Sequence, residues 1–111
     1  MRLRERDKQT VRLRGMTGMA DDTCTWGEAT PIRAAIYPAG ERLDPRVYGE
    51  HVSDMRLMLY DGQLTLRPGM GVAVGEGDAP QYRIVSVERW AHQRAVLEGI
   101  PEGRRGSGAE A

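Results

Sequence analysis

The sequence predicts a mainly β protein: a small single-domain β-barrel of about six short strands with a long loop between strands 2 and 3. Apolar and polar residues alternate in several short segments, turn-forming Gly, Pro and Asp separate these segments, and no long helical apolar period occurs. With 111 residues the chain has room for one core. Because aromatics make up only 5% and Phe is absent, that core must be aliphatic, with Met as filler.

The first expected strand covers residues 8–14, where Val11 and Leu13 share one face and the polar side chains share the other. Residues 15–27 contain glycines and adjacent aspartates, so we expect a surface loop there, anchored by Trp26. A second strand is expected at residues 30–37, which are rich in β-branched and aromatic side chains.

The long connection covers residues 41–54. Asp44 and Pro45 could begin one helical turn, whereas Gly49 disfavours a long helix. Loops of this length inside compact domains are often functional.

The third strand is expected at residues 55–60, before the Asp61-Gly62 turn signal. The fourth is short and split: Leu64 and Leu66 are expected on one face, followed by an alternating segment at residues 71–75.

Residues 82–89 and 94–98 are expected to form the closing hairpin, with Tyr82, Ile84, Val87 and Leu97 in the core. The domain would span residues 1–100, and the small polar residues 101–111 would be a disordered tail.

Charge and cysteine content restrict the class of protein. The formal net charge is zero, which argues against a general nucleic-acid binder, although residues 1–14 carry six basic and two acidic side chains. This basic N-terminal arm suits docking on an acidic surface. The one cysteine, Cys24, forms no intramolecular disulfide, which fits a reducing cytoplasm. No signal peptide or membrane-spanning stretch is expected.

No catalytic, metal or cofactor site emerges from the residue spacing. The glycine-rich residues 69–77 lack the Lys-Ser/Thr pair and the following helix of a phosphate-binding loop. Cys24 has no basic neighbour in the sequence that would activate its thiol. We therefore expect no enzymatic activity and no cofactor. A metal site or an acid–base pair could in principle be formed by Asp21, Asp22 and Glu28 with His51 or His92. No recognised spacing of these residues supports either site.

An alternative function is a small β-barrel module that binds single-stranded nucleic acid through stacked aromatics and nearby arginines. Strict alternation would place Tyr82 and Arg83 on opposite faces, which argues against a shared platform. A third possibility is an enzyme subunit whose site has no recognisable motif.

The order of these segments resembles a known family. The likeness lies in the basic first strand, Trp26-Gly27, residues 31–38, residues 47–56, and above all the end of the chain. There Gly69-Met-Gly-Val precedes Gln81-Tyr-Arg-Ile-Val-Ser-Val, Trp90-Ala-His and Ala95-Val-Leu-Glu. In this order the chain resembles the head-closure, or head-tail joining, proteins of tailed bacteriophages, which include head-completion and stopper proteins.

The resemblance implies a virion structural protein of the head-tail connector, assembled in the host cytoplasm as a ring below the portal. Such a protein closes the DNA-filled head and provides the tail attachment surface. Its implied partners are further copies in the ring, a portal or adaptor protein, tail proteins and passing double-stranded DNA without sequence specificity, but no membrane. Exposed strand edges of the barrel would supply contacts between neighbouring copies.

The resemblance makes the long loop the candidate channel or gating element, and the two charged ends of the chain the candidate docking segments. The channel and gating candidates are Arg42, Asp44, Arg46, Tyr48, Glu50, His51 and Asp54. The portal or partner docking candidates are Arg2, Arg4, Arg6, Arg104 and Arg105.

Overall fold

The computed structural model describes residues 4–20, 23–38, 55–75, 79–89, 91–100 and 105. Within these residues, one short 3-10 turn, η1 (Glu5–Asp7), precedes eight β-strands. The strands are β1 (Gln9–Arg14), β2 (Met16–Ala20), β3 (Thr23–Trp26), β4 (Thr30–Pro38), β5 (Arg56–Tyr60), β6 (Gly71–Val74), β7 (Tyr82–Arg89) and β8 (Gln93–Gly99).

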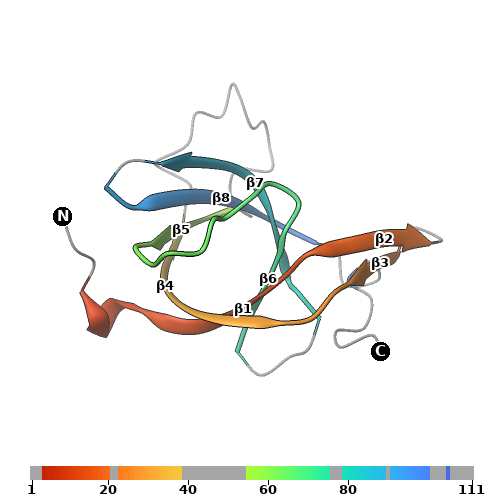
Figure 1. Cartoon of the computed structure of the whole chain (residues 1–111), viewed down its shortest axis with the longest axis horizontal. Coiled ribbons are helices and arrows are strands. Elements are labelled where there is room, and N and C mark those ends of the chain that lie inside the picture. The colour runs from red at the N-terminus through yellow and green to blue at the C-terminus, as the bar shows by residue number, and fades with distance from the viewer. Residues whose placement is uncertain are drawn as a thin grey trace.

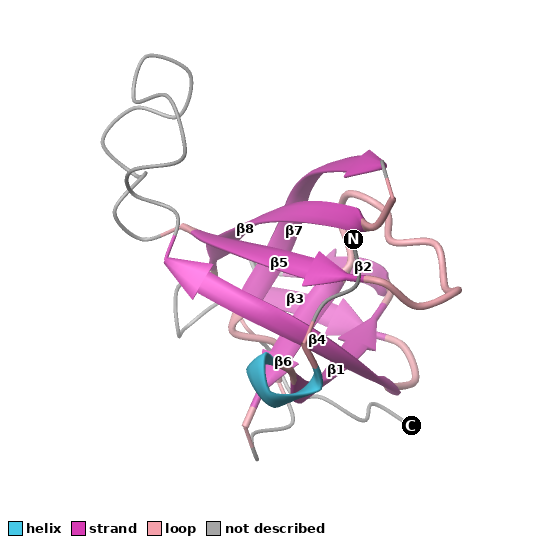
Figure 2. Cartoon of the chain, turned by 90° about the vertical axis from the view of Figure 1, so that its left-hand side faces the viewer, coloured by secondary structure: helices cyan, strands magenta, loops and turns pink. Residues whose placement is uncertain are grey.

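Six strands form a closed antiparallel barrel in the order β1-β4-β5-β8-β7-β6, and β6 pairs back to β1 (Figures 1 and 2). The predicted mainly β barrel is therefore confirmed, with the long connection between the second and third barrel strands, β4 and β5. Closure pairs both sides of every barrel strand, so the expectation of exposed barrel edges is wrong.

Alternate residues of each barrel strand point inward and fill the interior with aliphatic side chains. On β1 the inward residues are Val11 and Leu13, and on β4 they include Ile32 and Ala34. The barrel core comprises Val11, Leu13, Ile32, Ala34, Met58, Tyr60, Leu66, Val72, Ile84, Ala95 and Leu97. Only Tyr60 is aromatic, as the composition indicated.

A β-bulge in β7 changes which residues face the core. Ile84 pairs with Leu97 and Ser86 pairs with Val96, so Val85 is the extra residue and is exposed. After the bulge, Val87 packs against the same core as Ile84. The predicted core position of Ile84 and Leu97 is confirmed, and Tyr82 and Val87 are partly buried against them. Strict alternation along β7, which would separate Ile84 from Val87, was wrong.

Residues 15–27, expected to be a surface loop, instead contain the two strands of a hairpin. β2 and β3 pair with each other as a separate sheet that projects from the barrel (Figure 1). The hydroxyl groups of Thr17 and Thr25 lie 3.1 Å apart across the two strands and form a hydrogen bond. Threonines at positions 23 and 25 favour an extended backbone, which outweighs the turn-forming residues around them.

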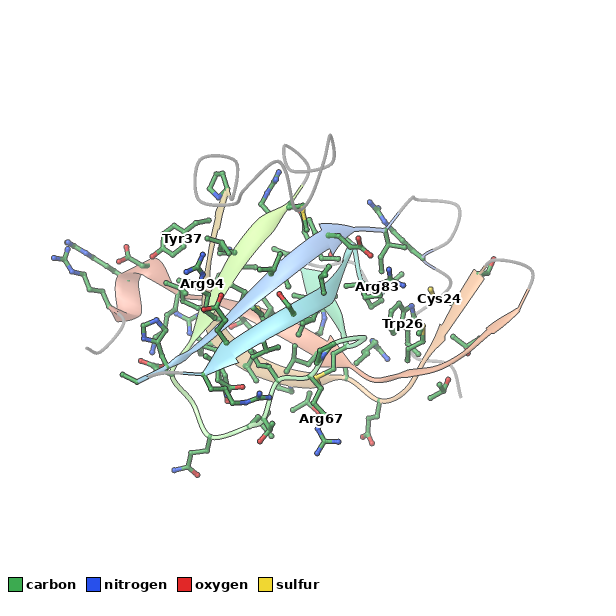
Figure 3. The ribbon with its side chains drawn as sticks, turned by 90° about the horizontal axis from the view of Figure 1, so that it is seen from above. Cys24, Trp26, Tyr37, Arg67, Arg83 and Arg94 are labelled. Atoms are coloured by element: carbon green, nitrogen blue, oxygen red, sulfur yellow. The ribbon has the colours of Figure 1, made fainter. Side chains whose placement is uncertain are left out.

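Trp26 anchors this hairpin, as predicted, in a second core outside the barrel. It is 1% exposed and packs with Cys24 and Ile100. Figure 3 shows Cys24 and Trp26 together at the base of the hairpin. The indole Nε1 donates a hydrogen bond of 2.7 Å to the carbonyl oxygen of Arg105. The hairpin base is thus tied to the C-terminal part of the domain.

Residues 61–70 are an irregular segment that covers one end of the barrel, rather than half of a split strand. Leu66 is fully buried, whereas Leu64 is 43% exposed, so the two side chains do not share a face. The Gln93 side chain accepts a hydrogen bond from Leu66 N and donates one to Leu64 O. The Gln93 side chain at the start of β8, rather than strand pairing, therefore positions residues 64–66.

Candidate interaction surfaces

The N-terminal arm presents two of its predicted docking residues to solvent. Arg4 and Arg6 are exposed on either side of the start of η1, where Asp7 N donates a 3.0 Å hydrogen bond to Arg4 O. Arg2 lies outside the described residues. The exposure of Arg4 and Arg6 is the geometry that docking on an acidic partner requires.

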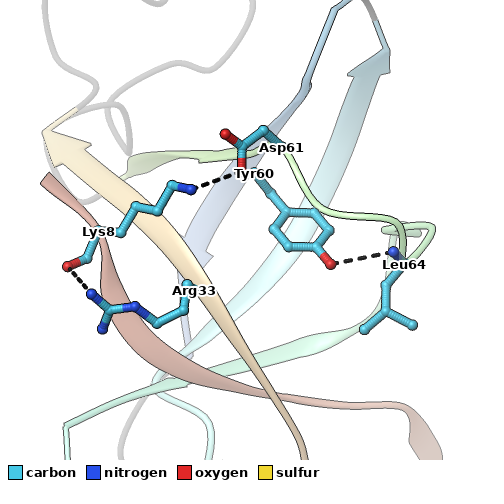
Figure 4. A network of polar contacts seen from close by, with 5 residues as sticks. All are labelled: Lys8, Arg33, Tyr60, Asp61 and Leu64. Carbon is cyan, nitrogen blue, oxygen red and sulfur yellow. Dashed lines mark hydrogen bonds and ion pairs between the residues drawn. The ribbon is translucent and has the colours of Figure 1, made fainter. Parts of the chain in front are cut away.

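Lys8 has a different role from these two arginines because its ammonium group is turned toward the barrel. Its Nζ lies 2.9 Å from Asp61 Oδ1, and the two side chains are 11% and 19% exposed. The Lys8 carbonyl accepts a hydrogen bond of 3.2 Å from Arg33 (Figure 4). Lys8 thus fixes the base of the arm to the end of β5, with Arg4 beyond it.

The basic face of β1 is occupied by contacts within the chain. Arg12 donates a 2.7 Å hydrogen bond to Gly75 O, and Arg14 donates one of 2.7 Å to Gly27 O. Arg14 is only 5% exposed, so it lies beneath the hairpin base rather than on a solvated strand face. The sequence pattern gave no sign of this burial, because Arg14 falls on the polar side of the strand.

Arg105 is the docking candidate for which the structure shows contacts within the chain. It is half-buried, its carbonyl accepts from Trp26, and its Nε donates a 2.8 Å hydrogen bond to Ile100 O. Trp26 and Ile100 thus supply partners within the chain for both its backbone and its side chain, and its docking role stays a prediction. Arg104 lies outside the described residues.

The predicted channel and gating residues all lie outside the described residues; they are Arg42, Asp44, Arg46, Tyr48, Glu50, His51 and Asp54. The structure does describe where the connection leaves and rejoins the barrel, since Pro38 pairs with Arg56. The Arg56 guanidinium donates to Met55 O and lies 5.9 Å from the centroid of the Tyr82 ring. A cation–π contact therefore lies at the barrel end that carries this connection.

The described aromatic side chains do not form an exposed stacking platform. Trp26 and Tyr60 are buried, and Tyr37 and Tyr82 are half-buried. Tyr82 packs against the barrel core, whereas Arg83 pairs with Glu98 on the outer face. This arrangement gives the nucleic-acid alternative no support in the part of the chain that the structure describes.

Possible reactive groups are scattered over the described part of the chain. Cys24 is buried with a free thiol, Glu28 is exposed and His92 is half-buried. Asp21, Asp22 and His51 lie outside the described residues. Among the residues that are described, no group of three or more His, Cys, Asp or Glu side chains could hold a metal ion.

No protein-family model matches the chain, and no curated protein or solved structure is significantly similar to it. None of the described helical segments is long and apolar enough to cross a membrane.

Proposed function

We propose that this chain is a virion structural protein of the head-tail connector of a tailed bacteriophage. Copies form a ring below the portal, close the DNA-filled head and provide the tail attachment surface. One observation carries most of this proposal: η1 and the β2–β3 hairpin lie at opposite ends of the longest axis (Figure 1). A ring needs two different, complementary surfaces on each copy, and this shape supplies two candidates.

The closed barrel limits how neighbouring copies can join. Each of its strands has a partner strand on both sides, whereas β2 and β3, among the described residues, pair only with each other. Backbone groups at the outer edges of this hairpin are available for strand pairing. In the proposed ring, contact between copies therefore uses the hairpin and surface side chains, while the barrel acts as the rigid body.

The order of sequence segments that resembles head-closure proteins supports the connector role, and the burial of the described aromatics weakens the nucleic-acid alternative. The two functions differ in solution behaviour. The connector role predicts weak binding of single-stranded oligonucleotides at moderate salt and ring-shaped particles in electron micrographs of the assembled protein. Tight oligonucleotide binding by a monomer would instead support the alternative.

The decisive experiment locates the chain in virus particles. Antibody–gold labelling of tailed particles from cells that carry this gene should mark the junction of head and tail. Deleting residues 42–52 should leave the purified barrel folded, measured by circular dichroism, but should release DNA from filled heads. Unlabelled junctions, or virions of the deletion variant that retain all their DNA, would contradict the connector role.

The basic arm is tested separately by reversing charge. Replacing Arg2, Arg4 and Arg6 with Glu should weaken attachment to the partner, more so at low salt, where electrostatic attraction is strongest. The matched control replaces the same residues with Lys, which preserves the charge. Equal attachment of the Glu and Lys variants at low salt would remove the arm from the docking surface.

A further inference from the structure

A shallow groove of about 610 Å³ lies where the barrel and the projecting hairpin separate. β1 pairs with β6 as far as Arg14 and Gly71. Beyond this pair, β1 continues through Gly15 into β2, while the chain that precedes Gly71 turns away. The groove between these diverging segments is lined by Gly15, Met16, Thr65, Arg67, Pro68, Gly69 and Met70.

One wall of the groove is a fixed turn. Met70 N donates to Arg67 O at 3.3 Å, with Pro68 and Gly69 between them, and Gly69 has a φ of 95°. These are the features of a type II turn, which needs a residue that tolerates positive φ at its third position. Gly69 N donates to Ile84 O, and Ile84 N donates to Met70 O. Because β7 holds the turn, the groove is formed before any ligand arrives.

The opposite wall is an open strand edge. In the described part of the chain, β2 pairs only with β3, so its other edge is unpaired. This unpaired edge of β2 continues the edge of β1 that pairs with β6. Met16, at the start of β2, is 39% exposed and lines the groove. An extended segment in the groove could therefore pair with backbone groups of β2 while a side chain contacts Met16.

The groove combines an apolar lining with a positive rim. Met16 and Met70 supply thioether side chains. Met70 packs against the barrel core and its sulfur accepts a 3.3 Å hydrogen bond from Arg67 N, whereas the exposed Met16 side chain can adapt to apolar partners of different shapes. The exposed Arg67 side chain points away from the barrel (Figure 3). Its guanidinium makes no hydrogen bond or ion pair with any described residue, and none of the described residues that line the groove is acidic. An incoming carboxylate would therefore meet an arginine that has no competing carboxylate among the described lining residues.

We infer that this groove binds an extended, acidic segment of a partner protein by adding a strand to β2. An apolar side chain of that segment enters between Met16 and Met70, and a neighbouring carboxylate pairs with Arg67. This site is distinct from the basic arm. It uses the outer edge of β2, so contact between copies in the proposed ring is left to the outer edge of β3 and to surface side chains.

The test uses the full chain with ¹³C-labelled methionine methyl groups. The probe is the peptide acetyl-Glu-Ile-Glu-Leu-Glu-amide, and the matched control peptide has Lys in place of each Glu. The acidic peptide should shift the methyl resonances of Met16 and Met70 in a saturable manner. Met55 and Met58, which are 3% and 0% exposed, should not respond and serve as internal references.

Charge reversal at the rim identifies the contact. Arg67→Glu should weaken binding of the acidic peptide by about tenfold or more and should favour the lysine peptide, because the ion pair is replaced by repulsion. Arg33→Glu, which reverses an exposed arginine of β4 that does not line the groove, should change the affinity by less than about twofold. Unchanged resonances of Met55 and Met58 will establish that both variants are folded.

Three results would overturn the inference. The first is that neither peptide shifts the methyl resonances of Met16 and Met70. The second is that the acidic peptide binds Arg67→Glu as well as it binds the parent chain. Alternatively, the two methyl resonances move with protein concentration in the absence of peptide, which would make the groove a contact between copies of this chain.

Discussion

Trp26 lies so close to Gly71 that no side chain fits between them. A Cβ atom at position 71 would lie 2.7 Å from Cζ3 of the indole and 2.6 Å from Cγ of Pro80. Real Cβ contacts are not this short, so the absence of a side chain at Gly71 lets the hairpin base rest on the outer face of β6.

Replacing Gly71 with Ala should therefore lower the free energy of unfolding by about 1–3 kcal/mol, because the ring or the strand must shift. Gly15→Ala is the control, since a Cβ there meets no atom within 4 Å. Its effect should stay within about 0.5 kcal/mol. Urea unfolding followed by circular dichroism measures both variants. Equal losses at the two positions would show that the Trp26 contact does not explain the effect.

Shortening the chain should reveal the contribution of Arg105 to the second core. A chain that stops after Ile100 lacks the carbonyl that accepts from Trp26 Nε1. Loss of this hydrogen bond should lower the free energy of unfolding by about 1 kcal/mol and shift the emission of Trp26 to longer wavelength. A chain that stops after Gly106 keeps the acceptor and is the control.

The emission is measured with Trp90 replaced by Phe, so that Trp26 is the one tryptophan in the chain. Identical spectra and stabilities for the two shortened chains would contradict a role for Arg105 in covering Trp26.

Two ion pairs allow a comparison of burial. Lys8 and Asp61 are 11% and 19% exposed, whereas Arg83 and Glu98 are 40% and 35% exposed. Solvent screens the more exposed pair, so double-mutant cycles with alanine should give a coupling energy of about 1–2 kcal/mol for Lys8–Asp61 and below about 1 kcal/mol for Arg83–Glu98. Thermal or urea unfolding of each single and double variant supplies the energies. A larger coupling for Arg83–Glu98 would reverse the expected order.

The turn that forms the groove wall should be sensitive to backbone conformation. Gly69→Ala places an L side chain at a φ of 95° and should destabilise the fold by about 1–2 kcal/mol. Asn tolerates positive φ better than Ala, so Gly69→Asn should lose less stability. Chemical unfolding of the two variants gives the comparison, and an Asn variant less stable than the Ala variant would exclude backbone strain as the cause.

Local patterns predicted most barrel strands because they reflect local physics. Val11 and Leu13 alternate with polar residues on β1, and the turn glycines Gly69 and Gly75 flank β6 with positive φ. The hairpin was missed because Gly18 and the adjacent aspartates favour a turn. The alternation of Thr23 and Thr25 with buried Cys24 and Trp26 was the signal that could have revealed β3.

The bulge at Val85 and the burial of Arg14 could not be read from alternation. Both depend on contacts with other segments of the chain. Val85 is left without a partner by the register of β7 against β8, and the Arg14 guanidinium donates a hydrogen bond to Gly27 O. Local patterns do not reveal the contact of Arg105 for the same reason: its partner Trp26 lies 79 positions away. The groove could not be predicted either, because its lining residues Met16 and Met70 are far apart in the sequence and meet only in the folded chain.

The pairing of β1 with β6 bears on how fast the molecule can form. Arg12 bonds to Gly75, 63 positions further along the chain, at the seam where the barrel closes. A ribosome must therefore release more than half of the chain before this seam can form, and closing so long a loop costs conformational entropy before its contacts return any energy. We expect slow, seam-limited folding, during which the edges of β1 and β6 are open to pairing with other nascent chains.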